Sequence, residues 1–251
     1  MKPTDKFSGK ADVYSKSRPS YPTEYIDYLL SVNSLNESSR VADIGSGTGI
    51  LTRQLLERGV SVVAVEPNDD MRTKAEQDLK QYEHFTSIKG SAEATSLPDK
   101  SIDLVIAAQA FHWFDQKKFK FECKRILKQE AKVSLVWNSR DFTSPLIKEN
   151  AEIFKKYCPN FYGFSGGIGE GEELFNQFFR HDEFEFKKFP NDLVMDFEGF
   201  LGRNLSASYS LKESDKEFEF FVEAITNLFE KYSHNGKIFM PNYTRSYLGK
   251  V

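Results

Sequence analysis

One acid and three closely spaced glycines are the residues of this chain with the clearest chemical meaning. They stand in the run Val41-Ala-Asp43-Ile-Gly45-Ser46-Gly47-Thr-Gly49. Apolar residues recur at helical spacing after it, so the run predicts a buried strand, a turn and the start of a helix. In that arrangement the free backbone N–H groups of the turn face a bound nucleotide-like ligand. We expect Asp43 to lie near an ammonium group of that ligand.

A second acid, Glu66, ends the next predicted strand, about twenty residues after Gly45. A carboxylate at this place can accept hydrogen bonds from both hydroxyls of a ribose. The glycine spacing then favours one class of cofactor. Ile50 stands where a dinucleotide-binding loop usually has its third glycine, and the pattern is more typical of S-adenosylmethionine sites. A nicotinamide dinucleotide, or a tight turn that binds nothing, is the alternative.

Two short segments could enclose the adenine of such a ligand. Pro67 and Met71 follow Glu66 closely and would flank the ring, although Met71 could equally belong to the core. Ser91-Ala92-Glu93 follows the third predicted strand and could present a backbone N–H and a carboxylate to the adenine edge. An exposed loop acid is the alternative interpretation of Glu93.

Strands and helices must alternate if these residues are to meet. The strands are predicted at 41–44, 61–66, 85–89, 102–108 and 131–137, with helices before and between them. This alternation is typical of an α/β protein whose mostly parallel sheet has helices on both faces. Asp69 or Asp70 is expected to cap the helix at about 71–81.

The second half of the chain does not alternate in this way. It predicts helices near 141–158, 197–206 and 216–232, a strand at 183–189, and a last strand at 237–248. Residues 159–171 are rich in glycine and aromatic residues, as in a mobile lid. We therefore divide the chain into a cofactor-binding core with its lead-in (1–140), a mostly helical substrate cap with a returning strand (141–235) and the final core strand (236–251).

Composition narrows the class of protein. The 34 basic and 37 acidic residues give a net charge of −3, so the basic surface of a nucleic-acid-binding protein is not expected. No stretch approaches the ~20 apolar residues of a membrane span. Cys123 and Cys158 lack the spacing of a metal site or a disulfide scaffold. These features predict a cytoplasmic protein, a monomer or homodimer, without a metal, a membrane or a nucleic-acid partner.

Several motifs together resemble a known family. They are Asp43-Ile-Gly-Ser-Gly-Thr-Gly49, Glu66, Ala92-Glu93 and Leu97-Pro98-x-x-Ser101-Ile102-Asp103-Leu104. In this combination the chain resembles the class I S-adenosylmethionine-dependent methyltransferases with a type 11 domain. Three further motifs are similar to the trans-aconitate methyltransferase-like branch: Tyr14-x-x-x-Arg18-Pro19-x-Tyr21-Pro22, Gln109-Ala-Phe111-His112-Trp113-Phe114 and Leu201-Gly-Arg203-x-x-x-Ala207-Ser-Tyr209. Asn204 and Leu205 depart from that branch, where a serine or threonine followed by tryptophan is expected.

The resemblance implies a Rossmann-like seven-stranded sheet of order 3-2-1-4-5-7-6 with one antiparallel strand and a helical cap. It also implies that Tyr14 and Arg18 reach the methionine end of S-adenosylmethionine, with Arg18 paired to its carboxylate. Gln109 and Phe111 would lie beside the transferring methyl group. The activity implied is methyl transfer to a small-molecule acceptor, on a carboxylate or hydroxyl oxygen. A nicotinamide-dependent oxidoreductase and an inactive S-adenosylmethionine-binding protein remain alternatives.

His112 is the candidate catalytic residue. A neutral imidazole could remove the proton of a hydroxyl acceptor, whereas a carboxylate acceptor needs no base and would only be oriented. With His112, the aromatic residues Trp113, Trp137 and Tyr209 are predicted to contact the acceptor.

Overall fold

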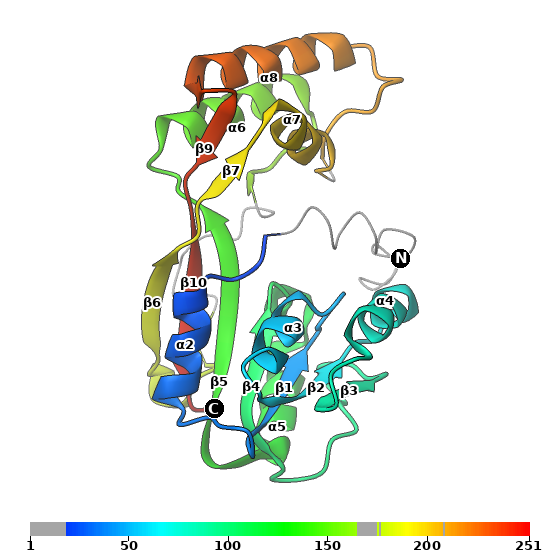
Figure 1. The fold of residues 1–251 in the computed structure, drawn as a ribbon, viewed down its shortest axis with the longest axis vertical. Coiled ribbons are helices and arrows are strands. Elements are labelled where there is room, and N and C mark those ends of the chain that lie inside the picture. Colours follow the sequence, from blue (N-terminus) through cyan, green and yellow to red (C-terminus); the bar gives the residue numbers. More distant parts are fainter. Residues whose placement is uncertain (1–18, 165–174, 176, 208) are drawn as a thin grey trace. The chain divides into compact units, whose positions relative to one another are not determined.

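A computed structural model describes residues 19–164, 175, 177–207 and 209–251 (Figure 1). These residues fall into two compact units. The first unit comprises the described residues of Met1–Asn138, Glu172–Phe189 and Thr244–Val251. The second takes in the described residues of Ser139–Gly171 and of Pro190–Tyr243.

A seven-stranded sheet forms the centre of the first unit, in the order β3-β2-β1-β4-β5-β10-β6. Its strands are β1 (Arg40–Ile44), β2 (Ser61–Val65), β3 (Phe85–Ile88), β4 (Ile102–Ala108), β5 (Leu127–Arg140), β6 (Glu185–Pro190) and β10 (Asn242–Gly249). The first five strands in this order pair in parallel. β5 and β6 lead into the second unit at their carboxyl ends and β10 leaves it at its amino end, so β10 runs antiparallel to both neighbours. The predicted fold class and strand order are confirmed.

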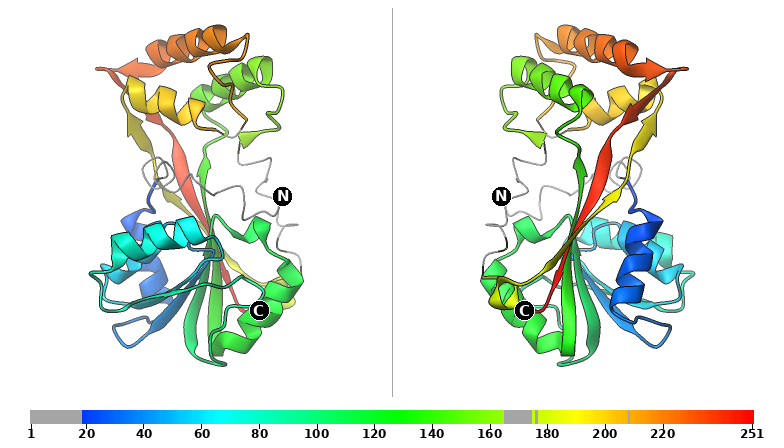
Figure 2. Two further views of the ribbon diagram at one scale, coloured as in Figure 1. Left: turned by 90° about the vertical axis from the view of Figure 1, so that its right-hand side faces the viewer. Right: turned by 90° about the vertical axis from the view of Figure 1, so that its left-hand side faces the viewer.

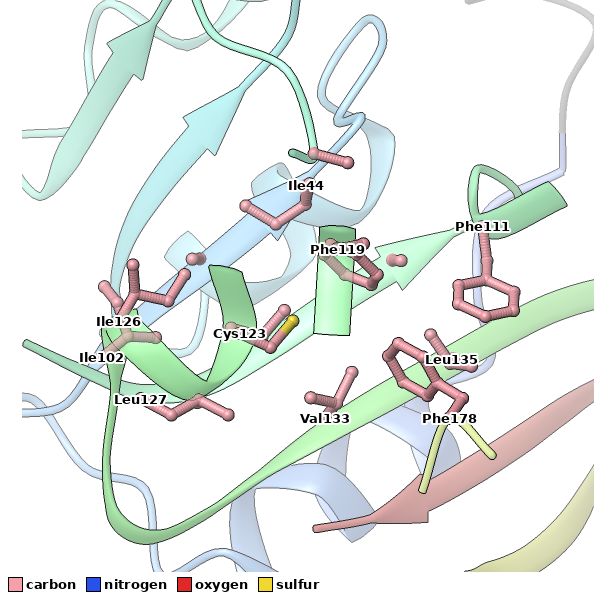
Figure 3. Packing of buried hydrophobic residues seen from close by; sticks show 14 of the residues in the cluster. Ile44, Ile102, Phe111, Phe119, Cys123, Ile126, Leu127, Val133, Leu135 and Phe178 are labelled. Carbon is pink, nitrogen blue, oxygen red and sulfur yellow. The ribbon is translucent and has the colours of Figure 1, made fainter. Parts of the chain in front are cut away.

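Helices cover both faces of this sheet (Figure 2). α2 (Thr23–Val32), α3 (Ile50–Leu56) and α4 (Asp69–Leu79) pack on one face, with Val41, Val62 and Leu104 of the strands. α5 (Gln116–Ile126) belongs to the other side, where the core holds Ile44, Phe119, Cys123 and Phe178 (Figure 3). Successive strand residues thus alternate between two apolar layers, as expected for a sheet buried on both faces.

The second unit has a core and a small sheet of its own. α6 (Pro145–Tyr157), α7 (Phe197–Leu205) and α8 (Phe218–Tyr232) are helices, and β7 (Leu193–Met195), β9 (Lys237–Met240) and β8 (Ser233–His234) form an antiparallel sheet in that order. The core is rich in aromatic side chains, including Phe154, Phe200 and Phe221. Asn150 is buried here as well and donates a hydrogen bond to Asn204 at 3.0 Å.

Some predicted boundaries and caps were wrong. The single last strand at 237–248 is two strands, because the chain leaves the small sheet at Pro241, which has no N–H to donate to a ladder. The strand predicted at 183–189, in contrast, is present as β6 of the seven-stranded sheet. Asn68, and not Asp69 or Asp70, caps α4, since its side chain accepts a hydrogen bond from the N–H of Met71 at 3.0 Å.

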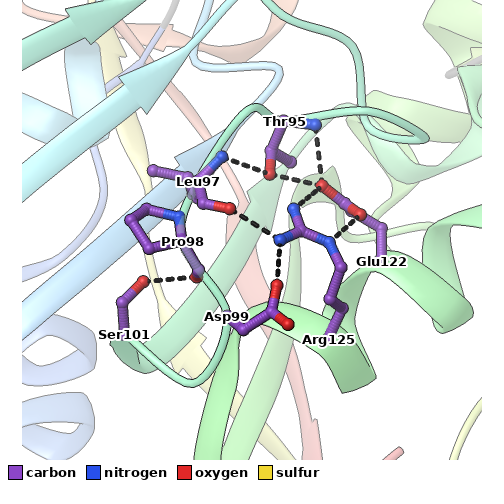
Figure 4. A network of polar contacts seen from close by, with 7 residues as sticks. All are labelled: Thr95, Leu97, Pro98, Asp99, Ser101, Glu122 and Arg125. Atoms are coloured by element: carbon purple, nitrogen blue, oxygen red, sulfur yellow. Dashed lines mark hydrogen bonds and ion pairs between the residues drawn. The ribbon is translucent and has the colours of Figure 1, made fainter.

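A polar network fastens α5 to the loop between β3 and β4 (Figure 4). The buried carboxylate of Glu122 accepts hydrogen bonds from the N–H and hydroxyl of Thr95 and from the guanidinium of Arg125, which also contacts Asp99. Burial by itself would raise the pKa of Glu122, but Arg125 and Thr95 outweigh it and lower this pKa to about 2. The ionised carboxylate is therefore part of the folded structure.

We expect Glu122→Ala to lower the free energy of unfolding by about 2–3 kcal/mol, because Thr95 and Arg125 lose their common partner. In the parent protein the contribution of Glu122 is complete above its unfolded pKa of about 4.3 and is lost as the pH falls toward 2. Urea denaturation of the parent and of Glu122→Ala from pH 7 to pH 3 measures this. Glu152→Ala, which breaks an exposed ion pair with Lys155, is the control. A stability gap that does not narrow at low pH contradicts the assignment.

Candidate functional site

The glycine loop between β1 and α3 adopts a backbone that requires glycine at all three positions. Gly45, Gly47 and Gly49 have φ values of +71°, +57° and +79°. A Cβ on Gly45 would lie 2.8 Å from the Cβ of Ala110, and one on Gly49 would lie 2.7 Å from Leu79. A Cβ on Gly47, in contrast, would have no described atom within 4 Å. The outer glycines are therefore needed for packing, and the middle one leaves open space above the loop.

That space is a pocket at the carboxyl edge of the sheet. It is lined by Pro19, Tyr21, Asp43, Gly45, Ser46, Gly47, Thr48, Ile50, Leu51, Ala108, Gln109 and Asn138. Five of the predicted cofactor residues are among them: Asp43, Gly45, Ser46, Gly47 and Gln109. The prediction missed the other seven. Ala108 and Asn138 lie at or near the ends of β4 and β5, a position that could have identified them.

Asp43 is a buried carboxylate with one oxygen held and one available. The hydroxyl of Thr52, on α3, donates a hydrogen bond to Oδ2 at 2.6 Å. Oδ1 is buried and has no hydrogen-bond partner among the described residues. Burial raises the pKa of Asp43 to about 6; the bond from Thr52 acts against this rise and the charge of Glu66 adds to it. A cationic ligand group at Oδ1 would offset the penalty of burying this charge.

Three buried oxygens of the pocket share this lack of a partner. They are Oδ1 of Asp43 and the hydroxyl oxygens of Ser46 and Thr48, each without a hydrogen bond within the described part of the chain. Buried polar groups are normally satisfied, so three such atoms on β1 and the loop after it point to a polar ligand that supplies their partners. The set fits an amino acid-like end of S-adenosylmethionine, whose ammonium donates and whose carboxylate accepts hydrogen bonds.

Glu66 joins the end of β2 to the glycine loop. One carboxylate oxygen accepts a hydrogen bond from the N–H of Gly47 at 2.9 Å, and the other accepts one from the N–H of Asn68 at 2.8 Å. Burial raises the pKa of Glu66, and these two bonds offset part of the rise. A carboxylate has about four acceptor sites, so both oxygens keep the capacity to bind a ribose hydroxyl.

The residues predicted around the adenine are mostly buried. Met71 lies on α4 and is buried, and Ala92 is part of the core. Pro67 is half-buried. The N–H of Ser91 donates to the carbonyl of Ala94 in an isolated bridge. One oxygen of Glu93 accepts a hydrogen bond from the N–H of Asp115 at 2.9 Å, at the start of α5. Glu93 therefore has a structural role that the spacing did not reveal.

Gln109 has an unusual backbone for its position after β4. Its φ is +57°, a conformation that is uncommon for residues other than glycine and that concentrates at functional sites. Its N–H donates to the carbonyl of Val136, and its side-chain amide donates to the carbonyl of Asn138. The side chain is thus held between the ends of β4 and β5, at the pocket.

Phe111, His112 and Trp113 form the short helix η2. Phe111 is fully buried and packs against Phe178 and Trp137, so its side chain belongs to the core and not to the pocket. Trp137 is likewise buried in the core. These two aromatic side chains were predicted to contact ligands; in the described residues both pack within the core of the first unit.

His112 is partly buried beside the exposed ring of Trp113. Burial lowers the pKa of His112 to about 4, so its imidazole is neutral at physiological pH. Its Nδ1 is buried and has no hydrogen-bond partner in the described ranges. Tyr209 lies in the second unit, packed against Phe154 and Phe161. Tyr14 and Arg18 lie outside the described residues.

Comparison with known proteins decides the family. A family described as "Methyltransferase domain" matches residues 42–135. An uncharacterized methyltransferase of Mycobacterium tuberculosis is 40% identical over 147 residues, which cover 59% of this chain and 58% of that protein. An uncharacterized methyltransferase-like protein of Schizosaccharomyces pombe is 31% identical over 219 residues, or 83% of this chain and 81% of that protein. The chain belongs to the S-adenosylmethionine-dependent methyltransferase family.

The fold of this methyltransferase agrees with that membership. A structure from Anaeromyxobacter dehalogenans, assigned provisionally as a type II methyltransferase, superposes with a TM-score of 0.66 at 20% identity and covers 92% of this chain and 95% of its own. The class I fold implies S-adenosylmethionine as the methyl donor. Among the residues that the structure describes, no cluster of His, Cys, Asp and Glu could hold a metal ion. No helix in the same ranges has the length and apolar character that a membrane crossing requires.

We expect Asp43→Asn to bind the cofactor at least tenfold more weakly and yet to be more stable. The raised pKa of Asp43 means that its ionisation lowers the free energy of unfolding as the pH rises from about 3.8 to about 6. Asparagine removes that charge, can still accept the Thr52 bond, and should raise stability at pH 8 by up to about 3 kcal/mol. Thermal unfolding at pH 5 and pH 8, with calorimetric titration, checks both effects. A variant that is less stable at pH 8, or that binds normally, refutes this role.

Proposed function

We propose that this chain transfers the methyl group of S-adenosylmethionine to an oxygen of a small-molecule acceptor, a carboxylate or a hydroxyl. The observation that carries the cofactor part is the set of three buried, unpartnered oxygens around the open Gly47. They offer Asp43 for the ammonium and the Ser46 and Thr48 hydroxyls for the rest of the methionine end. Glu66 would hold the ribose hydroxyls through oxygens already fixed by Gly47 and Asn68. The acceptor class follows the resemblance to the trans-aconitate methyltransferase-like branch.

The bound cofactor supplies a methyl group on a sulfonium, which an oxygen nucleophile displaces in line. Such a reaction depends on positioning and on exclusion of water more than on proton transfer. Tyr14 and Arg18 would contact the methionine end, with Pro67, Met71 and the 91–93 segment around the adenine. Trp113 would contact the acceptor, and we propose the second unit, to which Tyr209 belongs, as the substrate cap.

His112 favours a carboxylate acceptor over a hydroxyl. A base with a pKa of about 4 removes a hydroxyl proton poorly, because general bases work best with a pKa near the working pH. A neutral imidazole with a free Nδ1 can still orient an acceptor by a hydrogen bond. We therefore propose orientation as its role, with a nucleophile that is already ionised.

Two experiments test the activity. Calorimetric titration should show micromolar binding of S-adenosylmethionine and none of NADH. A tritiated-methyl transfer screen over carboxylic acids, phenols and amines, with products identified by mass spectrometry, should give a methyl ester or ether. Binding of NADH alone would support an oxidoreductase instead. Tight binding with no transfer to any acceptor would indicate an inactive S-adenosylmethionine-binding protein.

Glu66→Gln should weaken S-adenosylhomocysteine binding by roughly 10- to 100-fold, because a charged acceptor of the ribose hydroxyls is lost. A 2′-deoxy analogue isolates this contact. It should bind the parent much more weakly than S-adenosylhomocysteine does, and the variant only slightly more weakly. Glu57→Gln, at an exposed acid that contacts Tyr82, is the matched control. If the parent and Glu66→Gln prefer S-adenosylhomocysteine over the 2′-deoxy analogue by the same factor, Glu66 does not bind the ribose hydroxyls.

His112→Asn should lower kcat at least tenfold and leave cofactor affinity within twofold. Since the imidazole stays neutral above about pH 5, the parent kcat/KM profile should show no ionisation of His112 between pH 6 and 9. His84→Asn, at an exposed histidine, is the control. Full activity of His112→Asn, or a limb of the profile near pH 6.5 that disappears in it, contradicts the proposed role.

A further inference from the structure

Residues 19–22, just before α2, form one wall of the pocket through Pro19 and Tyr21. The segment has no regular secondary structure, so its backbone has no ladder to satisfy it. Two of its four residues are prolines, which have no N–H. All four of its carbonyls nevertheless accept hydrogen bonds. The carbonyl of Pro22 accepts from the first turn of α2. Side-chain amides serve the other three.

Gln54 on α3 holds Tyr21 through both of its backbone polar groups. The N–H of Tyr21 donates to Oε1 of Gln54 at 2.9 Å, and Nε2 of Gln54 donates to the carbonyl of Tyr21 at 2.7 Å. An N–H can only donate and a carbonyl can only accept, so this pair also fixes the orientation of the amide. Of the common side chains of this length, only glutamine offers both a donor and an acceptor here.

Asn138, near the end of β5, holds Pro19 and Ser20, the two residues before Tyr21. Its side-chain NH₂ donates to the carbonyls of Pro19 and Ser20, each at 3.2 Å, and its Oδ1 accepts from the hydroxyl of Thr244 at 2.5 Å. The same residue lines the pocket and receives Gln109 on its backbone carbonyl. The side-chain amides of Gln54 on α3 and Asn138 on β5 therefore hold residues 19–22 beside the pocket by hydrogen bonds.

We propose that Gln54 and Asn138 are positioning residues that hold residues 19–22 as a fixed wall of the cofactor pocket. Gln54 itself does not belong to the lining found in the described residues, so any effect on the ligand passes through Tyr21. Because the segment is already ordered, ligand binding does not have to pay the entropy of ordering it, and the ligand dissociates more slowly. This inference rests on the proposed function, because it takes the pocket to be the cofactor site.

The test uses S-adenosylhomocysteine as the probe and Gln54→Met, which keeps the side-chain length and removes both hydrogen bonds. We expect the dissociation constant to rise roughly tenfold, mainly through faster dissociation. Amide hydrogen exchange at Tyr21 should accelerate, while kcat at saturating cofactor stays within twofold. Gln81→Met is the control, since exposed Gln81, which follows α4, donates one hydrogen bond to the backbone carbonyl of Asp78 within that helix. Its affinity and exchange at Tyr21 should equal those of the parent.

A double variant tests the shared role. If both amides act on one segment, the Gln54→Met/Asn138→Ala double variant should raise the dissociation constant, relative to the parent, by a factor smaller than the product of the factors for the two single variants. A factor equal to that product would show that Asn138 acts separately from Gln54, and would overturn their shared role in holding residues 19–22. If Gln54→Met does not fold, Gln54→Glu replaces it, because glutamate still accepts from the N–H of Tyr21 but cannot donate to its carbonyl.

The outcomes separate this inference from the proposed function. Faster exchange at Tyr21 with unchanged affinity and dissociation rate refutes the positioning role and leaves the cofactor assignment intact. Absence of S-adenosylhomocysteine and S-adenosylmethionine binding by the parent protein refutes the proposed function, and the inference with it.

Discussion

Parallel pairing of β1 with β2 and β4 is the constraint on which the site depends. Asp43 lies beside Ala64 and Ile106 in this register, and parallel strands end at one edge of the sheet. That edge therefore carries Asp43, Glu66 and Gln109 together. The register also determines which face of the sheet each side chain occupies. Val41 packs in the layer of α3, and Asp43 meets Thr52 of α3 on that same face. Ala42 and Ile44 face the other layer. A slip by one residue would place the Asp43 carboxylate in an apolar core.

In the proposed site, the polar groups that hold the glycine loop are also the groups that would bind the ligand. Glu66 accepts a hydrogen bond from the backbone of Gly47, and Thr52 orients Asp43, so both carboxylates are held in place by the protein itself. Burying two carboxylates so close together is unfavourable, and both pKa values are raised. Ionisation of these two carboxylates therefore lowers stability, at the position where the proposed cofactor site uses negative charge. The network of Glu122 and Arg125, at the edge of α5, shows the opposite case, in which pairing makes a buried carboxylate stabilising.

Much of the fold could be predicted because its signals are local. Apolar runs marked β1, β2 and β4, and spacing of 3.6 residues marked α5 and α8. The small sheet of the second unit could not be found this way. β7 and β8 have three and two residues, too few for a period to show, and they are strands only because β9 pairs with them. Likewise, the division at Pro241 depends on which sheet each side of it joins.

The site shows the same division between local and distant information. The sequence by itself determined the glycine loop, the two acids and hence the cofactor class, because backbone conformation and charge are properties of the residues and of their spacing. Only the tertiary structure decided which neighbours those residues have. It assigned Phe111 and Trp137 to the core and brought Tyr21 to Gln54, 33 positions away, and Pro19 to Asn138, 119 positions away. No local period encodes such pairs, since they exist only when the sheet has assembled and its edge has gathered the ends of separate strands.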